Sequence, residues 1–289
     1  MSEDPFVAHR NLLFTVAYEM LGTAADAEDV VQETWLRWAA ADTGDVRDPR
    51  AYLVRAVTRQ ALNRLRTVAR RREDYIGPWL PEPLITTADA ADDVELAEHV
   101  SLAMLTVLET LTPTERVVFV LHEVFEVPHG EIAEALDKTP AAVRQIAHRA
   151  RAHVRSRRPR MTVDATLQQR ALDGFVRAAR NGEIEAMIEL LAPEVTLITD
   201  GGGIAPAARR IVEGPAKVAA FLLGLTRKYP GYTATTVRVN GAPGLVLEGG
   251  DDYPGVLVLT VADGLITQLL VVRNPAKLGR IGDATRLTR

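Results

Sequence analysis

Residues 129–155, HGEIAEALDKTPAAVRQIAHRARAHVR, have the pattern of two helices joined by a tight turn. Thr139 can cap the second helix, and Pro140 suits its first position, where no amide donor is lost. Apolar residues at helical spacing predict the buried sides of the two helices: Ile132, Ala133 and Leu136 in the first, and Val143, Ile146, Ala150 and Val154 in the second. The segment therefore predicts a helix-turn-helix.

The other side of the second helix, together with its cap, carries residue types that contact DNA: Thr139, Arg144, Gln145, His148 and Arg155. A helix-turn-helix places its second helix in the major groove, where arginine and glutamine can read guanine and adenine edges. An ordinary helical hairpin is the alternative for the same pattern. The many arginines, and the small alanines that permit close approach, favour DNA.

A second basic segment lies upstream, at residues 55–72, where arginine is the only charged residue type. Helical spacing predicts a buried side of Val54, Val57, Ala61, Leu65 and Val68, and an opposite row of Tyr52, Arg55, Arg59, Asn63, Arg66 and Arg70. A stripe of arginines without acids suits a phosphate backbone, because each contact releases counterions. A merely solvated helix face normally mixes acidic and basic residues, so we favour nucleic acid.

Residues 21–40, LGTAADAEDVVQETWLRWAA, predict a helix that starts at Thr23, with Asp26 as its capping-box partner. The candidate core residues are Val30, Val31, Trp35 and Trp38. The remaining face is acidic and would suit a basic protein partner: Asp26, Glu28, Asp29, Gln32 and Glu33. Taken alone, a solvated N-terminal turn favoured by the helix dipole explains these acids better.

The composition excludes several classes of protein. The chain of 289 residues has no cysteine and a formal net charge of −4. It therefore has no disulfide or thiolate metal site, and it is not a uniformly basic nucleic-acid binder. Its N-terminus lacks the features of a secretory signal, and no apolar run approaches the roughly 20 residues of a membrane helix. We expect a soluble, cytoplasmic protein that does not bind membranes.

The stretch between the two basic segments, residues 74–95, is rich in proline and glycine and ends in an acidic run, which predicts an extended linker. It is unusual because it carries Trp79 and Leu80, whereas linkers are normally polar. Beyond residue 160 the pattern changes to mixed helices and strands. The clearest signal is VLVLTVADGLITQLLVV, residues 256–272, which predicts a hairpin with its turn at Asp263 and Gly264.

Together these elements resemble one family. DAEDVVQETWLRW, the arginine-rich helix, TPTERVVFVLHEVF, HGEIAEAL and PAAVRQIAHRARAHVR look like an extracytoplasmic-function sigma factor over residues 5–157. The resemblance implies two all-α domains, a helical bundle and a helix-turn-helix, that bind core RNA polymerase and promoter DNA.

The resemblance also implies a role for each face. The polymerase contacts would be Asp26, Asp29, Gln32, Glu33 and Trp35. The arginine-rich helix would recognise the −10 element through Arg55, Arg59, Asn63, Arg66 and Arg70. The helix from Pro140 would recognise the −35 element. Asn63 stands where many such factors carry aspartate, so a −10 base preference does not transfer.

Three further motifs, WLPEP at 79–83, DGGG at 200–203 and NPAKL at 274–278, resemble the subgroup with a SnoaL-like C-terminal domain, the sigma-J type. The resemblance implies an α+β, NTF2-like, cone-shaped domain that packs on the sigma domains and modulates them. Ile204 and Ala276 depart from the subgroup's pattern. The predicted regulatory interface is Trp79, Leu80, Pro81, Glu82, Pro83, Asp200, Gly201, Gly202, Gly203, Asn274, Pro275, Lys277 and Leu278.

Trp79 and Leu80 then have a reason to lie in a linker, because flanking prolines preorganise them as anchors for a partner surface. The alternative is that Trp79 closes the end of the first helical domain.

We predict that the C-terminal domain is not an enzyme. No histidine follows His153, and the candidate carboxylates Asp200, Asp251 and Asp252 lie in glycine-rich loops, where turns use aspartate anyway. The GGG run lacks the Lys-Ser/Thr of a P-loop, and the histidines show no metal-ligand spacing. We expect no metal and no cofactor, while a small-molecule ligand of this domain stays open.

The sequence thus predicts a sigma factor with a built-in regulatory domain, which is a monomer when free. The predicted domains are a polymerase- and −10-binding domain at 1–76, a linker at 77–97, a −35-binding domain at 98–160 and a SnoaL-like domain at 161–289. Two alternatives stay open. One is a free-standing helix-turn-helix regulator that does not bind polymerase. The other is a small-molecule-binding or enzymatic SnoaL-like protein.

Overall fold

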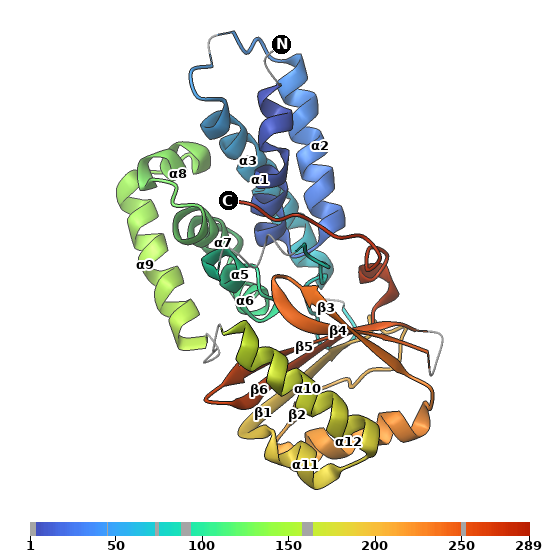
Figure 1. Cartoon of the computed structure of the whole chain (residues 1–289). Helices are drawn as coiled ribbons and strands as arrows, with labels where there is room; N and C mark the ends of the chain where they lie inside the picture. The colour runs from blue at the N-terminus through green and yellow to red at the C-terminus, as the bar shows by residue number, and fades with distance from the viewer. Residues whose placement is uncertain (1–3, 45, 73–74, 88–93, 158–163, 250–252) are drawn as a thin grey trace. The chain divides into compact units, whose positions relative to one another are not determined.

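The computed structural model describes residues 4–44, 46–72, 75–87, 94–157, 164–249 and 253–289. The chain divides into two compact units (Figure 1). The first comprises Met1–Glu73, Leu105–Arg158 and Arg286–Arg289, and the second comprises Asp74–Met104 and Pro159–Thr285. The segment that the sequence predicts as a linker therefore belongs to the same unit as the C-terminal domain.

The first unit begins with the packed helices α1 (Pro5–Leu21), α2 (Ala24–Ala40) and α3 (Pro49–Arg72). The carboxylate of Asp4 caps α1 by accepting the amide of Phe6, and Gly22 ends the helix in the left-handed conformation. The predicted apolar side of α3 is confirmed, since Val54, Val57, Ala61 and Leu65 are buried and Val68 is half-buried.

Two local predictions for α2 are wrong. Val30, Val31 and Trp38 are buried as predicted, but Trp35 is 44% exposed. The buried stripe continues from Val31 through Thr34 to Trp38, and Trp35 lies about 100° around the helix from Thr34. Thr23 precedes the helix, but its hydroxyl donates to the Asp26 carboxylate at 2.7 Å and caps no backbone amide, so the capping box does not form.

The rest of the first unit contains α7 (Pro113–Phe119), the π-helix η1 (Val120–Val124), α8 (His129–Leu136) and α9 (Pro140–Arg157). Asp137 ends α8 with a φ of 54°, and the Thr139 hydroxyl accepts the amide of Ala142 at 3.2 Å. The helix-turn-helix prediction is therefore confirmed, including its cap. Within this unit α3 packs against α7 and α8.

The short helices α5 (Val94–His99) and α6 (Leu102–Leu108) lie between the predicted linker and α7.

The second unit is built on a six-stranded sheet in the described part of the chain, with the order β2-β1-β6-β5-β4-β3. The strands are β1 (Leu191–Asp200), β2 (Val212–Glu213), β3 (Thr233–Val239), β4 (Ala242–Glu248), β5 (Gly255–Ala262) and β6 (Leu265–Val272). β1 and β6 are parallel, and the other described pairs are antiparallel. Asp263 and Gly264 join β5 to β6 with positive φ, which confirms the predicted hairpin.

Different segments cover the two faces of the sheet. Helices α10 (Ala165–Asn181), α11 (Ile184–Glu189) and α12 (Pro215–Lys228) pack on one face (Figure 1). The other face contacts the linker, the start of α6 and the segment after β6, through Leu80, Leu102, Ala103 and Leu278. Because side chains alternate along a strand, Val271 faces the core beneath α10, α11 and α12, and Val272 faces the core formed with the linker and α6. The predicted α+β class of the C-terminal domain is confirmed.

Candidate functional site

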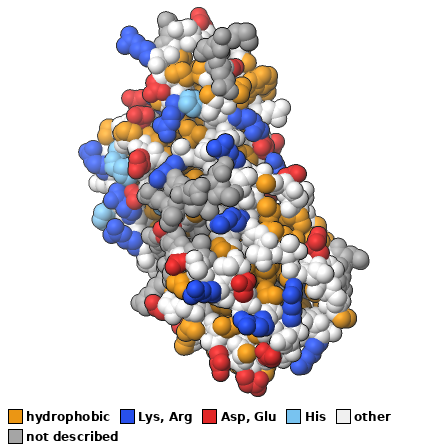
Figure 2. Space-filling model, in the orientation of Figure 1, with side chains coloured by type: hydrophobic (Ala, Val, Ile, Leu, Met, Phe, Trp, Pro, Cys, Tyr) orange, Lys and Arg blue, Asp and Glu red, His pale blue; other side chains and the backbone are white. Residues whose placement is uncertain are grey.

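The side of α9 opposite its core is exposed and basic. Val143, Ile146, Ala150 and Val154 are buried, as predicted. The exposed side chains include all the predicted contacts with the −35 element, Thr139, Arg144, Gln145, His148 and Arg155. Figure 2 shows lysine, arginine and histidine side chains gathered at the left edge, over α8 and α9, with a few acidic ones among them. The structure thus brings these residues to one surface, and their contact with DNA stays a prediction.

The predicted DNA-binding row of α3 is partly exposed. Asn63 and Arg66 point away from the core and are exposed. The side chain of Arg70 lies outside the described residues.

Two arginines of this row contact α8 instead. Arg59 donates from Nε to the carbonyl oxygen of Ala135 and from Nη2 to that of Glu134, both at 3.1 Å. Arg55 Nη1 lies 4.0 Å from a carboxylate oxygen of Glu134. The two carbonyls belong to the last turn of α8, where the helix dipole favours a cation. In this arrangement Arg59 holds the first helix of the helix-turn-helix.

The predicted protein-binding face of α2 is exposed at Asp29, Gln32, Glu33 and Trp35. Asp26 is half-buried and accepts Arg64 Nε at 2.7 Å, while Asp29 accepts Arg64 Nη2 at 3.1 Å. Leu36 is 55% exposed beside Trp35. Sequence reasoning missed Leu36, because a single apolar residue in an amphipathic helix is usually part of the core.

A polar cluster in the second unit centres on Asp200, the last residue of β1. Its side chain is fully buried. Oδ1 accepts the Tyr75 hydroxyl at 2.5 Å, and Oδ2 accepts the Leu80 amide at 2.9 Å and Lys277 Nζ at 2.6 Å. Asn274 Nδ2 donates to the Tyr75 hydroxyl at 2.7 Å. We call Tyr75, Leu80, Asp200, Asn274 and Lys277 the anchor cluster.

Lys277 connects this cluster to Trp79. Its Nζ also donates to the Leu80 carbonyl at 2.6 Å, and it lies 4.0 Å from the centre of the Trp79 ring and 5.0 Å from that of Tyr75. A cation is attracted to the face of an aromatic ring, more strongly where water is excluded. The structure thus places the half-buried Trp79 on Lys277 of the NPAKL motif, in the 3₁₀ helix η2 (Pro275–Lys277).

The hydroxyl of Tyr75 is held as a neutral donor. Burial first, and then the hydrogen bond to Asp200, raise the pKa of Tyr75 far above its ordinary value. The phenol therefore keeps its proton at any physiological pH and donates it to the carboxylate.

The glycines of DGGG make room for the cluster. Gly202 has a φ of 62°, its amide donates to Asp200 Oδ1 at 3.0 Å, and a Cβ there would overlap the Asn274 side chain. A Cβ at Gly201 would overlap the carbonyl oxygen of Ala205. Larger residues would therefore displace Asn274 or the loop backbone.

The linker continues from the anchor cluster into further backbone pairing. Residues 80–84 are buried, Glu82 among them. The Leu84 amide donates to Asn240 Oδ1 at 2.9 Å, and the Asn240 amide donates to the Leu84 carbonyl at 2.8 Å. Asn240 Nδ2 also reaches the Val100 carbonyl at 2.9 Å. Ile85 then pairs with Val239 as an isolated antiparallel bridge.

Sequence reasoning missed Tyr75 and Asn240. In the sequence, the pair Asn240-Gly241 indicates only a hairpin turn, and the structure confirms that turn with a φ of 52° at Asn240. Asp200 is a candidate catalytic carboxylate in the sequence, but in the structure it accepts hydrogen bonds from Tyr75, Leu80, Gly202 and Lys277. Asp251 and Asp252 lie outside the described residues. The described residues contain no group of three or more His, Cys, Asp or Glu that could hold a metal, and no described helix is long and apolar enough to cross a membrane.

Comparisons with known proteins point to one family. The models of Sigma-70 region 2 and Sigma-70 region 4 match residues 6–72 and 101–154. The ECF RNA polymerase sigma factor SigJ of Mycobacterium tuberculosis is 43% identical over 291 residues, which cover 96% of this chain and 93% of that protein. The probable ECF sigma factor SigI of the same species is 33% identical and covers 94% of this chain and 92% of that protein.

A solved structure agrees with these sequence matches. The crystal structure of the M. tuberculosis extracytoplasmic function sigma factor SigJ has a TM-score of 0.79 and 39% sequence identity, and it covers 94% of this chain and 96% of that chain.

Proposed function

Because the chain belongs to the extracytoplasmic-function sigma factors, which direct promoter-dependent transcription initiation by RNA polymerase, we propose that its SnoaL-like C-terminal domain controls this activity by holding the linker. The observation that carries the proposal is the anchor cluster, in which the buried Asp200 and Lys277 bind the backbone amide and carbonyl of Leu80.

The held segment is the covalent connection between α3 and α7, and therefore between the two promoter-binding parts of the chain. A free polar linker takes many conformations at little cost. Here the backbone of Leu80, Leu84 and Thr86 is hydrogen-bonded to the C-terminal domain, which restricts the arrangements open to the two parts. Release of the linker would remove this restraint and leave the packing of α3 against α7 and α8.

We assign the −35 element to α9 and the −10 element to α3. Support comes from the exposed Arg144 and Gln145, which are residue types that read base edges in the major groove. Asn63 and Arg66 present a second exposed face to DNA. Arg59 can bind a phosphate only after it leaves the carbonyls of α8, so promoter binding through α3 competes with the contact between α3 and α8.

We assign the contact with core polymerase to the exposed face of α2. Trp35 and Leu36 form an apolar centre, and Asp29, Gln32 and Glu33 give it a polar surround. Interfaces commonly combine an aromatic centre with a polar rim.

The C-terminal domain acts as a binding and regulatory domain, not as an enzyme. The carboxylate of Asp200 accepts hydrogen bonds from Tyr75, Leu80, Gly202 and Lys277, which leaves it a structural role. The sequence after His153 contains no histidine, which is the commonest general base.

The proposal is tested by transcription from a promoter with purified core polymerase and full-length variants. Asp200→Asn and Trp79→Ala should each change promoter-dependent transcription, while binding to core polymerase is retained. Asp263→Asn is the matched control, because this aspartate is exposed in a turn that accepts asparagine. If Asp200→Asn and Trp79→Ala both fold and transcribe as the wild type does, the linker does not mediate control.

A further inference from the structure

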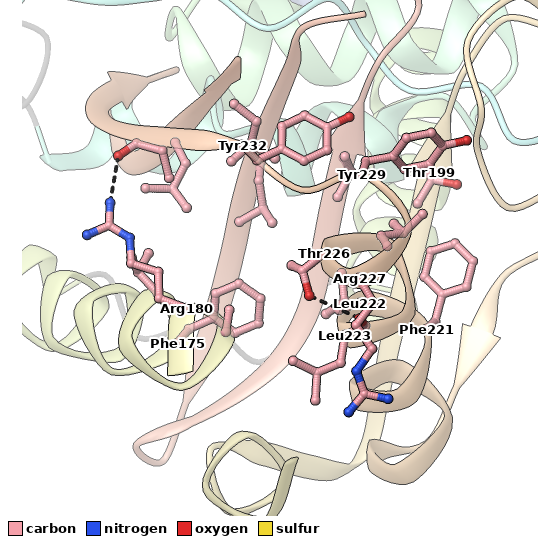
Figure 3. Close-up of a pocket in the computed structure, with 18 of the residues that line it drawn as sticks. Phe175, Arg180, Thr199, Phe221, Leu222, Leu223, Thr226, Arg227, Tyr229 and Tyr232 are labelled. Atoms are coloured by element: carbon pink, nitrogen blue, oxygen red, sulfur yellow. Dashed lines mark hydrogen bonds between the residues drawn. The ribbon is translucent and has the colours of Figure 1, made fainter. Parts of the chain in front are cut away.

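The second unit contains a pocket with a volume of about 480 Å³ between α10, α12 and the sheet (Figure 3). Its walls are mainly apolar and include Phe175, Phe221, Leu222, Leu245, Leu257 and Val271. Small-molecule sites commonly occupy about 300–1,000 Å³ and combine apolar walls with a few polar groups. The pocket therefore has the size and lining of a ligand site.

The charged residues that line the pocket are all basic. They are Arg180 from α10, Arg227 from the last turn of α12 and Arg273, which follows β6. Among the described residues of the lining, none is acidic. Figure 3 shows Arg180 and Arg227 on the two helices that flank the pocket, with the rings of Phe175, Phe221, Tyr229 and Tyr232 around it.

The three arginines are held differently. Arg273 is buried, and its guanidinium donates to the carbonyls of Pro206 and Tyr253 and to the Tyr232 hydroxyl at 2.8–3.1 Å. It thus provides a fixed positive charge in the wall. Arg180 and Arg227 are exposed, and Arg180 makes a long hydrogen bond, 3.4 Å, to the Ala234 carbonyl. These two side chains can turn towards a ligand at little cost.

We propose that this pocket binds a small amphipathic carboxylate, with its apolar body between α10, α12 and the sheet and its carboxylate among the arginines. A neutral apolar ligand would make no use of the basic residues, and a cation would be repelled by them. The planar guanidinium group binds carboxylates through paired hydrogen bonds. A single acidic group on an apolar body matches a lining that is mostly apolar.

Binding is tested by calorimetric titration of the full-length chain with three ligands of one chain length: decanoate, decanol and decyltrimethylammonium. Decanoate should bind most tightly, at one site per chain. Arg180→Ala combined with Arg227→Ala should weaken decanoate by about two- to thirtyfold, because two exposed charge contacts are lost, and leave decanol unchanged. Arg170→Ala combined with Lys217→Ala is the matched control, since both residues are exposed on the same helices outside the lining.

A second variant locates the apolar body. Ala179→Phe fills the pocket from a half-buried position on α10 and should abolish binding of decanoate and decanol alike. Equal affinity for decanoate and decanol, no effect of removing Arg180 and Arg227, or undiminished binding by a folded Ala179→Phe variant would each overturn the proposal. These measurements do not involve polymerase or DNA, so they are independent of the proposed control of transcription.

Discussion

The ammonium group of Lys277 lies 2.6 Å from the carboxylate of Asp200, and both side chains are buried. A buried ion pair is stable only when further hydrogen bonds satisfy both groups. Here Leu80 provides one to each partner, its amide to Asp200 and its carbonyl to Lys277. The linker is thus part of the ion pair's environment, and a change to either charge should release it.

Removal of one partner of this pair should destabilise the second unit strongly. Asp200→Asn or Lys277→Met should each lower the free energy of unfolding by about 3–5 kcal/mol, because the other charge stays buried without its partner. Denaturant unfolding measures this, with Asp263→Asn as the control. The double variant should cost less than the sum of the two. Additive losses would show that the two side chains act independently.

The stability of the first unit should depend on pH through Glu19. Burial raises the pKa of Glu19 from 4.5 to about 8, against the opposing effect of Arg116. The folded state keeps this carboxyl neutral while the unfolded chain ionises it. The contribution of Glu19 to the free energy of unfolding is therefore complete below pH 4.5 and is lost as the pH rises to about 8.

Glu19→Gln should remove this dependence, since glutamine does not titrate. Between pH 4.5 and about 8 the wild type should lose up to about 1.4 kcal/mol per pH unit relative to Glu19→Gln. Thermal unfolding of both chains across this range gives the difference. Parallel curves for the two chains would contradict the assignment.

Substitutions on α9 should change promoter selectivity. Arg144→Ala and Gln145→Ala should each reduce discrimination among −35 sequences by about 1–3 kcal/mol if each side chain contacts a base. Arg157→Ala, at the exposed end of the same helix, should weaken binding to all sequences alike. Competition binding with a set of −35 variants distinguishes the two. Unchanged selectivity in folded Arg144→Ala and Gln145→Ala chains would remove α9 as the reading helix.

The exposed face of α2 should determine affinity for core polymerase. Asp29→Ala combined with Gln32→Ala should weaken polymerase binding without unfolding α2, because Arg64 keeps its ion pair with Asp26. Competition with the wild-type chain for core polymerase measures the loss. Glu131→Ala in α8 removes an acid elsewhere and should have no effect. If the double variant binds core polymerase with wild-type affinity, this face of α2 is a solvated surface and does not contact polymerase.

A ligand bound in the pocket should reduce the local opening of the linker. Thr199, Val271 and Arg273 line the pocket, and the next residue after each is Asp200, Val272 or Asn274. Val272 belongs to the core on the opposite face of the sheet, and Asp200 and Asn274 belong to the anchor cluster. Occupancy should stiffen these strands and increase the protection of the Leu80 amide from hydrogen exchange. At a decanoate concentration that half-saturates the wild type, this effect should be smaller in a chain without Arg180 and Arg227, because less of that chain is occupied. Equal protection with and without bound decanoate would separate the pocket from the linker.

The sequence by itself determined the helix-turn-helix and the buried faces of α3 and α9, whereas in α2 it placed the exposed Trp35 in the core. These depend on apolar spacing over a few turns and on caps such as Thr139, so they are readable from neighbouring residues. The hairpin at Asp263 and Gly264 is local for the same reason. The three motifs of the C-terminal subgroup were also visible, because they are short and contiguous.

Only the tertiary structure decided what those motifs do together. Asp200 has the sequence context of a turn aspartate, but its partners Lys277, Leu80 and Tyr75 lie 77, 120 and 125 residues away. Arg59 has the pattern of a DNA contact and yet holds α8, 75 and 76 residues along the chain. A hydrogen bond at such separation leaves no periodic signal, and burial of a charge depends on which distant segments cover it. The anchor cluster and the arginine-lined pocket therefore exist only once the sheet has formed.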